Sequence, residues 1–251
     1  MEKKINNELY NTLGERWYSA DDDPVALLRA ENKLKSPWIV KILTDKGFAP
    51  GPDHRILDVG CGAGFLTNYC AQSGYEAVGL DISSESLEVA KRHDATHSVN
   101  YVRGDAYALP FPDASFSVVT CMDFLEHVDQ PETVIKEAAR VLKPGGLFFF
   151  HTFNRNPLSY LLVIKGVEWF VKNTPPDMHV YRLFIKPEEL TRYCLNVGLD
   201  VQTVLGIRPK FASKAFWKGL VSGTVPKDFE FTFTESTLLS YIGYAFKKGA
   251  K

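Results

Sequence analysis

The feature that most constrains the fold is a glycine-rich run at residues 58–64, which reads DVGCGAG. A short apolar strand precedes the run, and residues 65–73 have the spacing of a helix. Gly60, Gly62 and Gly64 let the backbone turn sharply and let a ligand approach the main-chain amides. The run therefore predicts a strand, a tight turn and a helix that together bind a nucleotide-like molecule.

Strands and helices alternate along the chain on both sides of this turn. Strands are predicted at residues 56–59, 75–81, 99–105, 115–122, 147–152, 201–207 and 238–246, and helices at 65–73, 83–93, 132–142 and 187–197. Such alternation is typical of parallel sheets with right-handed crossovers. We expect an α/β fold with a Rossmann-like, seven-stranded, mostly parallel sheet and helices on both faces.

The chain divides into four predicted segments. Residues 1–50 form an N-terminal helical segment, and residues 51–153 form the cofactor-binding core. Residues 154–186 form an inserted apolar cap, and residues 187–251 form the C-terminal part of the sheet. A chain of 251 residues with 45% hydrophobic residues suffices for one sizeable α/β core.

Composition excludes several classes of protein. The net charge of -1 gives no chain-wide basic field for nucleic acid. The four cysteines form no CxxC pair and no spacing typical of a zinc site. The N-terminus lacks the apolar run of a signal peptide, and no stretch reaches the ~18 apolar residues that span a bilayer. We expect a cytoplasmic protein that contacts a membrane at most peripherally.

Acidic residues at the strand ends indicate which cofactor binds. Asp81 and Ile82 end the second strand, where a carboxylate can accept from both ribose hydroxyls. Asp58 precedes the first glycine, and its charge suits an ammonium and a sulfonium but opposes a pyrophosphate. Asp105 and Ala106 close the third strand, where an acid can accept from the adenine amino group. These positions predict S-adenosyl-L-methionine, with a Rossmann domain for another nucleotide as the alternative.

The same motifs carry a family resemblance. Residues 58–64, Asp81, Gly104-Asp105-Ala106, Leu109-Pro-Phe and Leu142-Lys-Pro-Gly-Gly146 resemble the successive motifs of class I methyltransferases. The segments CMDFLEHV at 121–128, TFNRN at 152–156 and FIKPEEL at 184–190 are similar to the ubiquinone-biosynthesis O-methyltransferase family. That narrower resemblance runs from about residue 30 to 205, and little of it continues beyond residue 208.

Four residues just beyond the fourth strand are candidates for the acceptor site: Met122, Asp123, Glu126 and His127. A phenol loses its proton at about pH 10, so methyl transfer to it needs a base or a metal. Two carboxylates and an imidazole could hold a divalent cation such as Mg²⁺. The resemblance implies this role for Asp123, Glu126 and His127, with Met122 beside the cofactor. Base catalysis by His127 and a purely structural role remain alternatives.

Three further residues are weighed against plain structural roles. The resemblance places His179 over the acceptor, with a histidine packed in a cap loop as the alternative. Arg29 lies near a family arginine that reaches the cofactor carboxylate, although a solvated helix charge would look the same. His151 ends the fifth strand and points toward the cofactor edge, where the family usually has a small residue.

The insert at residues 157–172 is too apolar for an ordinary surface loop. It is either a cap that admits a lipid-tailed acceptor, with Trp169, Lys165 and Lys172 at a membrane surface, or a helix buried on the core. The favoured function is an S-adenosyl-L-methionine-dependent O-methyltransferase for a phenolic or catechol ring on a polyprenylated ubiquinone precursor. The alternatives are a methyltransferase for another small molecule and a non-catalytic cofactor-binding scaffold.

Overall fold

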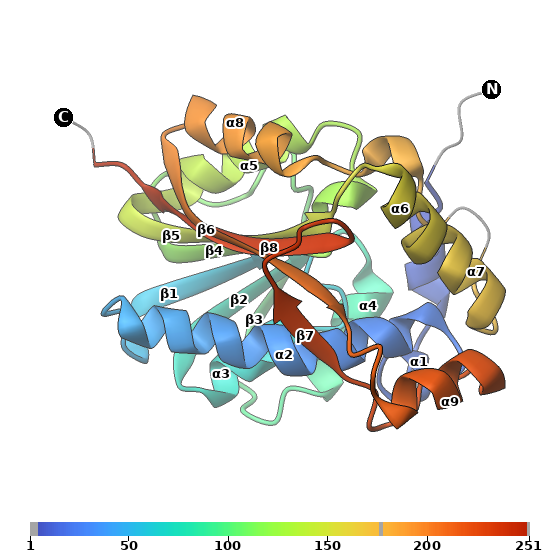
Figure 1. The fold of residues 1–251 in the computed structure, drawn as a ribbon. Helices are drawn as coiled ribbons and strands as arrows, with labels where there is room; N and C mark the ends of the chain where they lie inside the picture. The colour runs from blue at the N-terminus through green and yellow to red at the C-terminus, as the bar shows by residue number, and fades with distance from the viewer. Residues whose placement is uncertain (1–4, 176–177, 250–251) are drawn as a thin grey trace.

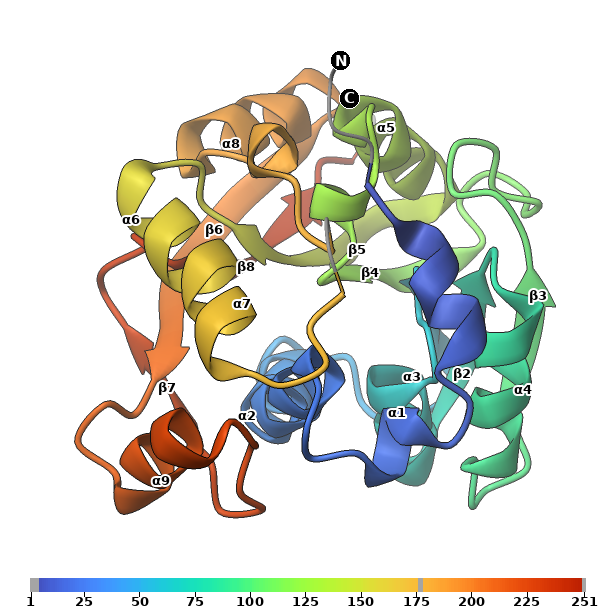
Figure 2. The ribbon, with the colours of Figure 1, turned by 90° about the vertical axis from the view of Figure 1, so that its right-hand side faces the viewer.

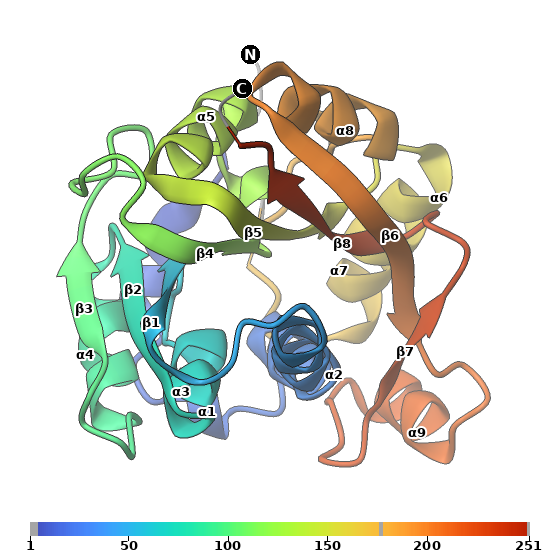
Figure 3. The same ribbon diagram turned by 90° about the vertical axis from the view of Figure 1, so that its left-hand side faces the viewer.

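The computed structural model describes residues 5–175 and 178–249, which build an α/β fold around one mixed sheet (Figures 1 and 3). The strand order is β3-β2-β1-β4-β5-β8-β6-β7, with β1 to β5 parallel and β8 antiparallel to both β5 and β6. The strands are β1 (Gly51–Val59), β2 (Tyr75–Asp81), β3 (Asn100–Arg103), β4 (Phe116–Met122), β5 (Leu142–Phe153), β6 (Leu199–Pro209), β7 (Phe231–Thr234) and β8 (Ser240–Lys247). The predicted fold class is confirmed.

The sheet has one strand more than expected. Strand β7 is only four residues long and pairs antiparallel with the end of β6 alone, from Gly206 opposite Thr234 to Pro209 opposite Phe231. Its side chains are half-buried, so no continuous apolar run marks it in the sequence. The short strand forms one edge of the sheet, beside β6.

Helices cover both faces of the sheet. Helices α5 and α8 lie on one face, and α2, α3 and α4 lie on the other (Figures 1 and 3). The helical segments are η1 (Asn7–Thr12), α1 (Arg16–Ser19), α2 (Pro24–Asp45), α3 (Phe65–Gln72), α4 (Ser84–Arg92), η2 (Leu125–His127), α5 (Pro131–Val141), α6 (Pro157–Ser159), the π-helix η3 (Tyr160–Lys165), α7 (Gly166–Phe170), η4 (Tyr181–Leu183), α8 (Pro187–Asn196) and α9 (Lys214–Ser222). Pro24 and Pro187 stand in the first turns of α2 and α8, where a missing N–H costs nothing.

The two faces bury separate apolar cores. Ala138 of α5 and Leu190 of α8 pack with the strand residues that face them, including Leu80 and Phe148. On the other face, Ile39 of α2 packs with residues of α3 and with the opposite side chains of β1, β4 and β5. Successive strand residues point to opposite faces, so these short apolar strands supply both cores at once.

One end of the sheet is surrounded by four segments distant in sequence. The insert helices α6 and α7, helix α9, the start of α2 and the N-terminal η1 lie around it (Figure 2). The Lys172 amide donates to the Gly223 carbonyl (3.0 Å), and the Val225 amide donates to the Asp21 carbonyl (2.6 Å). The first bond joins the insert to the end of α9. The second joins the loop after α9 to the N-terminal segment. No helix in the described ranges is long and apolar enough to cross a membrane.

Candidate active site

The glycine turn is as tight as its sequence predicts. Gly60 and Gly64 have φ values of 72° and 78°, which few side chains tolerate. A Cβ on Gly60 would lie 2.2 Å from the Phe124 ring, and one on Gly64 would lie 2.3 Å from the Tyr101 hydroxyl. The Gly62 amide donates to Oδ2 of Asp81 at 2.8 Å, so the turn and the second strand form one cradle.

The cradle opens into a pocket, here called the cofactor pocket, whose lining contains most of the predicted cofactor residues. Asp81 accepts from the amides of Gly62 and Ser83 and lines this pocket. Ile82 beside it is 66% exposed, an unusual state for a large aliphatic side chain and one that suits a flat ligand ring. The pocket is lined by polar and apolar groups that include Asp58, Gly60, Cys61, Gly62, Asp81, Ile82, Met122 and Asp123.

Asp58 is buried at the floor of this pocket. Thr67 and Thr120 each donate a hydroxyl hydrogen bond of 2.6 Å to its carboxylate. Burial raises the pKa of Asp58 to about 6, although these hydrogen bonds act in the opposite direction. A nearby positive group would therefore be bound best by the ionised carboxylate, above that pH.

Four predicted cofactor residues do not line the pocket: Gly64, Arg29, Asp105 and Ala106. The Arg29 guanidinium donates to the carbonyls of Trp17 (2.7 Å) and Ala20, so it holds the corner between α1 and α2. Asp105 is exposed and accepts from the Tyr107 amide, and Ala106 is buried in the core. The role of Asp105 toward an adenine amino group stays a prediction.

The N-terminal segment supplies pocket residues that the sequence reasoning missed. Asn7, Tyr10 and Trp17 line the pocket, and Tyr10 stacks on Trp17 with ring centroids 5.6 Å apart. The side-chain Nδ2 of Asn7 donates to the His127 carbonyl (3.0 Å). The sequence did show aromatic residues along its first twenty positions. Their spacing is typical of a helix that packs on a core, so it did not predict a pocket wall.

A second, apolar cavity of about 280 Å³ lies next to the cofactor pocket. Its walls come from the insert, α9, the ends of β6 and β7 and the first turns of α2: Leu27, Leu162, Val163, Val167, Phe170, Phe216, Leu220, Val225 and Phe231 contribute to them. Polar groups are few and include Glu126, His127 and His179. Tyr10, Leu28, Asp123 and His127 line both spaces, so the two spaces adjoin.

Glu126 is one of three acids that line the apolar cavity, with Glu31 and Asp123. The Thr152 hydroxyl donates to its Oε2 at 2.8 Å, whereas Oε1 is buried and has no hydrogen-bond partner among the described residues. Burial, followed by the charge of Asp123, raises the pKa of Glu126 to about 7. A carboxylate with a free oxygen and such a pKa is suited to proton transfer near neutral pH.

The two predicted histidines lie together at the same end of the cavity. The rings of His127 and His179 have centroids 5.5 Å apart, and the His179 ring packs edge-on against Phe153 at 5.1 Å. Burial lowers the pKa of His127 to about 3 and that of His179 to about 4, so both imidazoles are neutral at pH 7. The rings form an aromatic collar that a substrate ring could contact.

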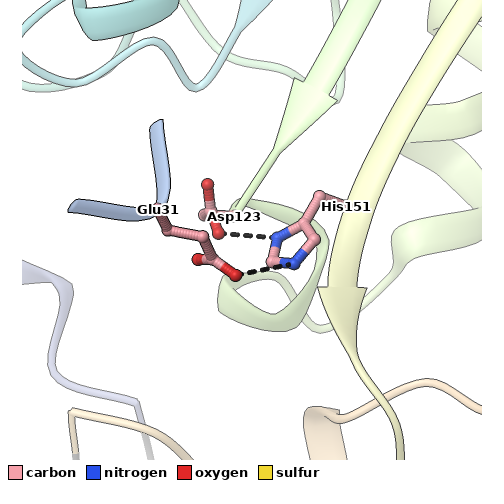
Figure 4. A group of neighbouring side chains, drawn as sticks. All are labelled: Glu31, Asp123 and His151. Atoms are coloured by element: carbon pink, nitrogen blue, oxygen red, sulfur yellow. Dashed lines mark ion pairs between the residues drawn. The ribbon is translucent and has the colours of Figure 1, made fainter. Parts of the chain in front are cut away.

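Behind this collar lies a buried ionic cluster, defined here as Glu31, Lys35, Asp123 and His151. Lys35 and His151 are completely buried. The Lys35 ammonium pairs with Glu31 at 3.2 Å and, more closely, with Asp123. His151 Nδ1 lies 2.7 Å from Asp123 Oδ1, and its Nε2 lies 3.4 Å from Glu31 Oε1 (Figure 4). These are ion-pair distances, although the atoms are not aligned as hydrogen bonds.

The cluster is stabilised by mutual neutralisation. Burial alone would lower the pKa values of Lys35 and His151 and so favour their neutral forms. The negative charges of Asp123 and Glu31 outweigh this effect, so that the pKa of Lys35 is raised and that of His151 is raised to about 9. The pKa values of both carboxyls are correspondingly lowered, against their own burial. The backbone of Asp123 is also unusual, with φ of 53°, and its amide donates to the His151 carbonyl at 3.1 Å.

The predicted metal ligands do not fit a divalent ion. Within the described residues, the one group of three whose ligand atoms lie within 4.8 Å of one another is Glu31, Asp123 and His151, not Asp123 with Glu126 and His127. The Asp123 carboxylate is already paired with an ammonium. Two unit charges of the same sign about 4 Å apart repel by about 4 kcal/mol at an effective dielectric of about 20. The Lys35 ammonium would repel a divalent cation at Asp123 by roughly twice that energy.

Sequence comparisons place the chain beside known methyltransferases. Residues 57–150 match a family model described as a methyltransferase domain. A ubiquinone biosynthesis O-methyltransferase of Nitrosospira multiformis is 36% identical over 232 residues, which are 87% of this chain and 94% of that protein. The protein of the same name from an Azoarcus species is 38% identical over 79% of this chain and 83% of its own length.

Structure comparisons give the same fold. A putative methyltransferase of Bacillus halodurans has a TM-score of 0.62 at 20% identity, covering 86% of this chain and 99% of that one. Magnesium protoporphyrin IX methyltransferase of Synechocystis, solved with bound S-adenosylhomocysteine, has a TM-score of 0.60 at 16% identity, covering 99% and 90%.

Proposed function

The chain belongs to the ubiquinone biosynthesis O-methyltransferase family and is an S-adenosyl-L-methionine-dependent O-methyltransferase, and on that premise we propose that its acceptor is a catechol ring carrying a prenyl tail. The observation that carries this proposal is the junction of two spaces that differ in lining. The pocket over the glycine turn mixes acids with apolar side chains, the adjoining cavity is lined almost wholly by apolar ones, and Asp123 and His127 line both. The ring would lie at the junction and the tail in the cavity.

The residues of the cofactor pocket suit S-adenosyl-L-methionine. Asp81 would accept from the ribose hydroxyls, Ile82 would pack on the nucleoside, and Asp58 would face the ammonium of the amino-acid tail. Phe124 and Trp17 pack against Gly60 and Gly62 so closely that a Cβ would displace them from the wall of the pocket. The cofactor would supply an electrophilic methyl group, and the pocket residues would orient it toward the acceptor oxygen.

Glu126 is the proposed general base. Glu126 lines the acceptor cavity, its Oε1 has no hydrogen-bond partner among the described residues, and burial raises its pKa to about 7. Glu126 would take the proton of the ring hydroxyl as the oxygen bonds to the methyl carbon and the carbon–sulfur bond breaks. The neutral imidazoles of His127 and His179 would hydrogen-bond the second hydroxyl. No step uses a divalent ion, because Asp123 is committed to Lys35.

The insert is the proposed contact with the membrane, where a prenylated acceptor resides. Its exposed side chains are Leu158, Tyr160, Leu161, Leu162, Trp169 and Phe170, and on neighbouring α9 they are Trp217 and Val221. Leu162 and Phe170 also line the cavity, so the exposed apolar surface is continuous with its wall. Lys172 after α7 and Lys218 on α9 are exposed, and their charges suit anionic headgroups.

An acceptor screen tests the proposed function. Purified protein would be incubated with labelled S-adenosyl-L-methionine and catechols that carry no tail, one prenyl unit or several. We expect transfer to one ring oxygen and a higher kcat/KM with the tail. Methylation of tailless catechols only, or of none, contradicts the proposed acceptor.

Sedimentation with anionic liposomes tests the membrane contact by comparing wild type with Trp169→Ala. Lack of lipid binding by wild type excludes that contact.

A further inference from the structure

The buried ionic cluster has the ligand geometry of a cation site, but the cation in it belongs to the protein. Oxygens of Glu31 and Asp123 and a nitrogen of His151 lie within 4.8 Å of one another. The Lys35 ammonium reaches both carboxylates, and the side chain is inaccessible to solvent. An ammonium is positive at every physiological pH, so the two carboxylates have a counter-ion without any solute.

We propose that Lys35 is the built-in cation of this active site, that its ammonium occupies the position a divalent ion would need at Asp123, and that methyl transfer by this enzyme is consequently independent of metal. This inference rests on the proposed function only in placing Asp123 beside the acceptor. Lys35 is a positioning residue, because it is buried behind Asp123 and does not line either space.

Two further contacts support a fixed role for the ammonium. Lys35 lies on α2, one turn after Glu31, whereas Asp123 follows β4, so the ion pairs join the N-terminal helix to the acceptor loop. Asp123 has a left-handed backbone, and its backbone N–H donates a hydrogen bond to the His151 carbonyl. These two features hold its carboxylate toward the cluster. Both oxygens of Asp123 are therefore engaged from the protein side, Oδ2 by Lys35 and Oδ1 by His151.

The test measures metal binding directly and needs no acceptor. Protein freed of metals by chelator is titrated with Mn²⁺, and free ion is followed by its electron paramagnetic resonance signal. Wild type, Lys35→Arg and the matched control Lys33→Met, which removes an exposed ammonium from the same helix, should bind no Mn²⁺ in the millimolar range. Lys35→Met should bind one ion per chain, and adding Asp123→Asn should abolish that binding.

The outcomes separate this inference from the proposed function. Stoichiometric Mn²⁺ binding by wild type overturns it, and so does a folded Lys35→Met that binds none. If Lys35→Met does not fold, the wild type still decides, because absence of Mn²⁺ binding together with chelator-resistant methylation of a catechol supports the inference. Failure of every acceptor tested would contradict the proposed substrate and leave the Mn²⁺ titration as the deciding measurement here.

Discussion

Glu126 is the residue on which the proposed chemistry depends most directly. Glu126→Gln keeps the shape and the bond from Thr152 but removes the proton acceptor. We expect kcat to fall by about 10²- to 10⁴-fold, the usual contribution of a general base, with little change in cofactor affinity. Steady-state kinetics with titration calorimetry checks this. The matched control is Glu132→Gln on the exposed first turn of α5. Equal kcat values for wild type and Glu126→Gln would remove Glu126 from the chemistry.

Asp58 predicts a pH dependence of cofactor binding. Its pKa of about 6 in the free protein lies above the ordinary value for Asp, so the carboxyl binds a proton as the pH falls through 6. An ammonium prefers the ionised form, hence cofactor affinity should be constant above about pH 7 and should fall below pH 6, by at most tenfold per unit. Calorimetry between about pH 5 and 8 measures the slope.

The Asp58→Asn variant is the control for that slope. It cannot titrate, so its affinity should be lower at pH 7 and nearly independent of pH. Any slope that remains belongs to Asp81, whose pKa is also raised by burial. A variant with the full wild-type slope would show that Asp58 does not contact the cofactor electrostatically.

At the level of single residues, the sequence predicts the acids of the site better than their partners. Asp58 and Asp81 lie at the carboxyl ends of their strands and Asp123 and Glu126 just beyond one, where ligands of parallel sheets bind. Glu31 and Lys35 were missed because a charged helix residue usually faces water. A signal did exist, since they continue the buried i, i+4 row of Ile39 and Leu43 toward the N-terminus. Two charges on an apolar stripe predict a buried ion pair, but not which residue completes it.

The turn between β1 and α3 is the element whose geometry is most exacting. Gly60→Ala would combine a backbone at φ 72° with a Cβ 2.2 Å from the Phe124 ring. We expect a loss of about 1 to 3 kcal/mol in the free energy of unfolding and a marked loss of cofactor affinity, since Phe124 must move. Urea denaturation and calorimetry measure the two effects.

Gly145→Ala is the matched control for the turn. Its φ is 77°, but a Cβ there would meet no atom within 4 Å. Backbone strain alone should cost about 1 kcal/mol and leave cofactor affinity unchanged. If both variants lose the same stability and keep the same affinity, close packing at the turn has no role in binding.

Among whole elements, those with strong periodicity were predicted and the short ones were not. Strands β2 and β4 and helices α5 and α8 lie within about a residue of their predicted bounds, because each combines an apolar pattern with a proline or glycine stop. Helix α9 and strand β7 were not predicted. They bury little of their own surface and depend on each other, on the insert and on α2. Tertiary contacts of that kind have no local pattern.

For the molecule as a whole, the insert and the C-terminal segment complete the acceptor side of a common methyltransferase core. Of the two interpretations of the insert, core packing holds for Ile164, which is buried, whereas Trp169 is 64% exposed and its contact with a membrane stays a prediction. The division of the chain into four segments stays a prediction. The cavity wall extends into α9, beyond about residue 208 where the sequence resemblance faded. Tail recognition should therefore be a property of this chain's own C-terminal part.

Leu220 and Val221 on α9 allow that idea to be tested with adjacent residues. Leu220 lines the apolar cavity, whereas Val221 is 88% exposed. Leu220→Trp should fill part of the cavity and exclude the tail, which loses about 0.8 kcal/mol per CH₂ left in water. We expect kcat/KM for a prenylated catechol to fall at least tenfold toward the tailless value, while kcat/KM for the tailless catechol is unchanged. With detergent-free, soluble acceptors and no liposomes, Val221→Trp should alter neither. If both variants keep the wild-type preference for the tail, the prenyl group binds outside this cavity.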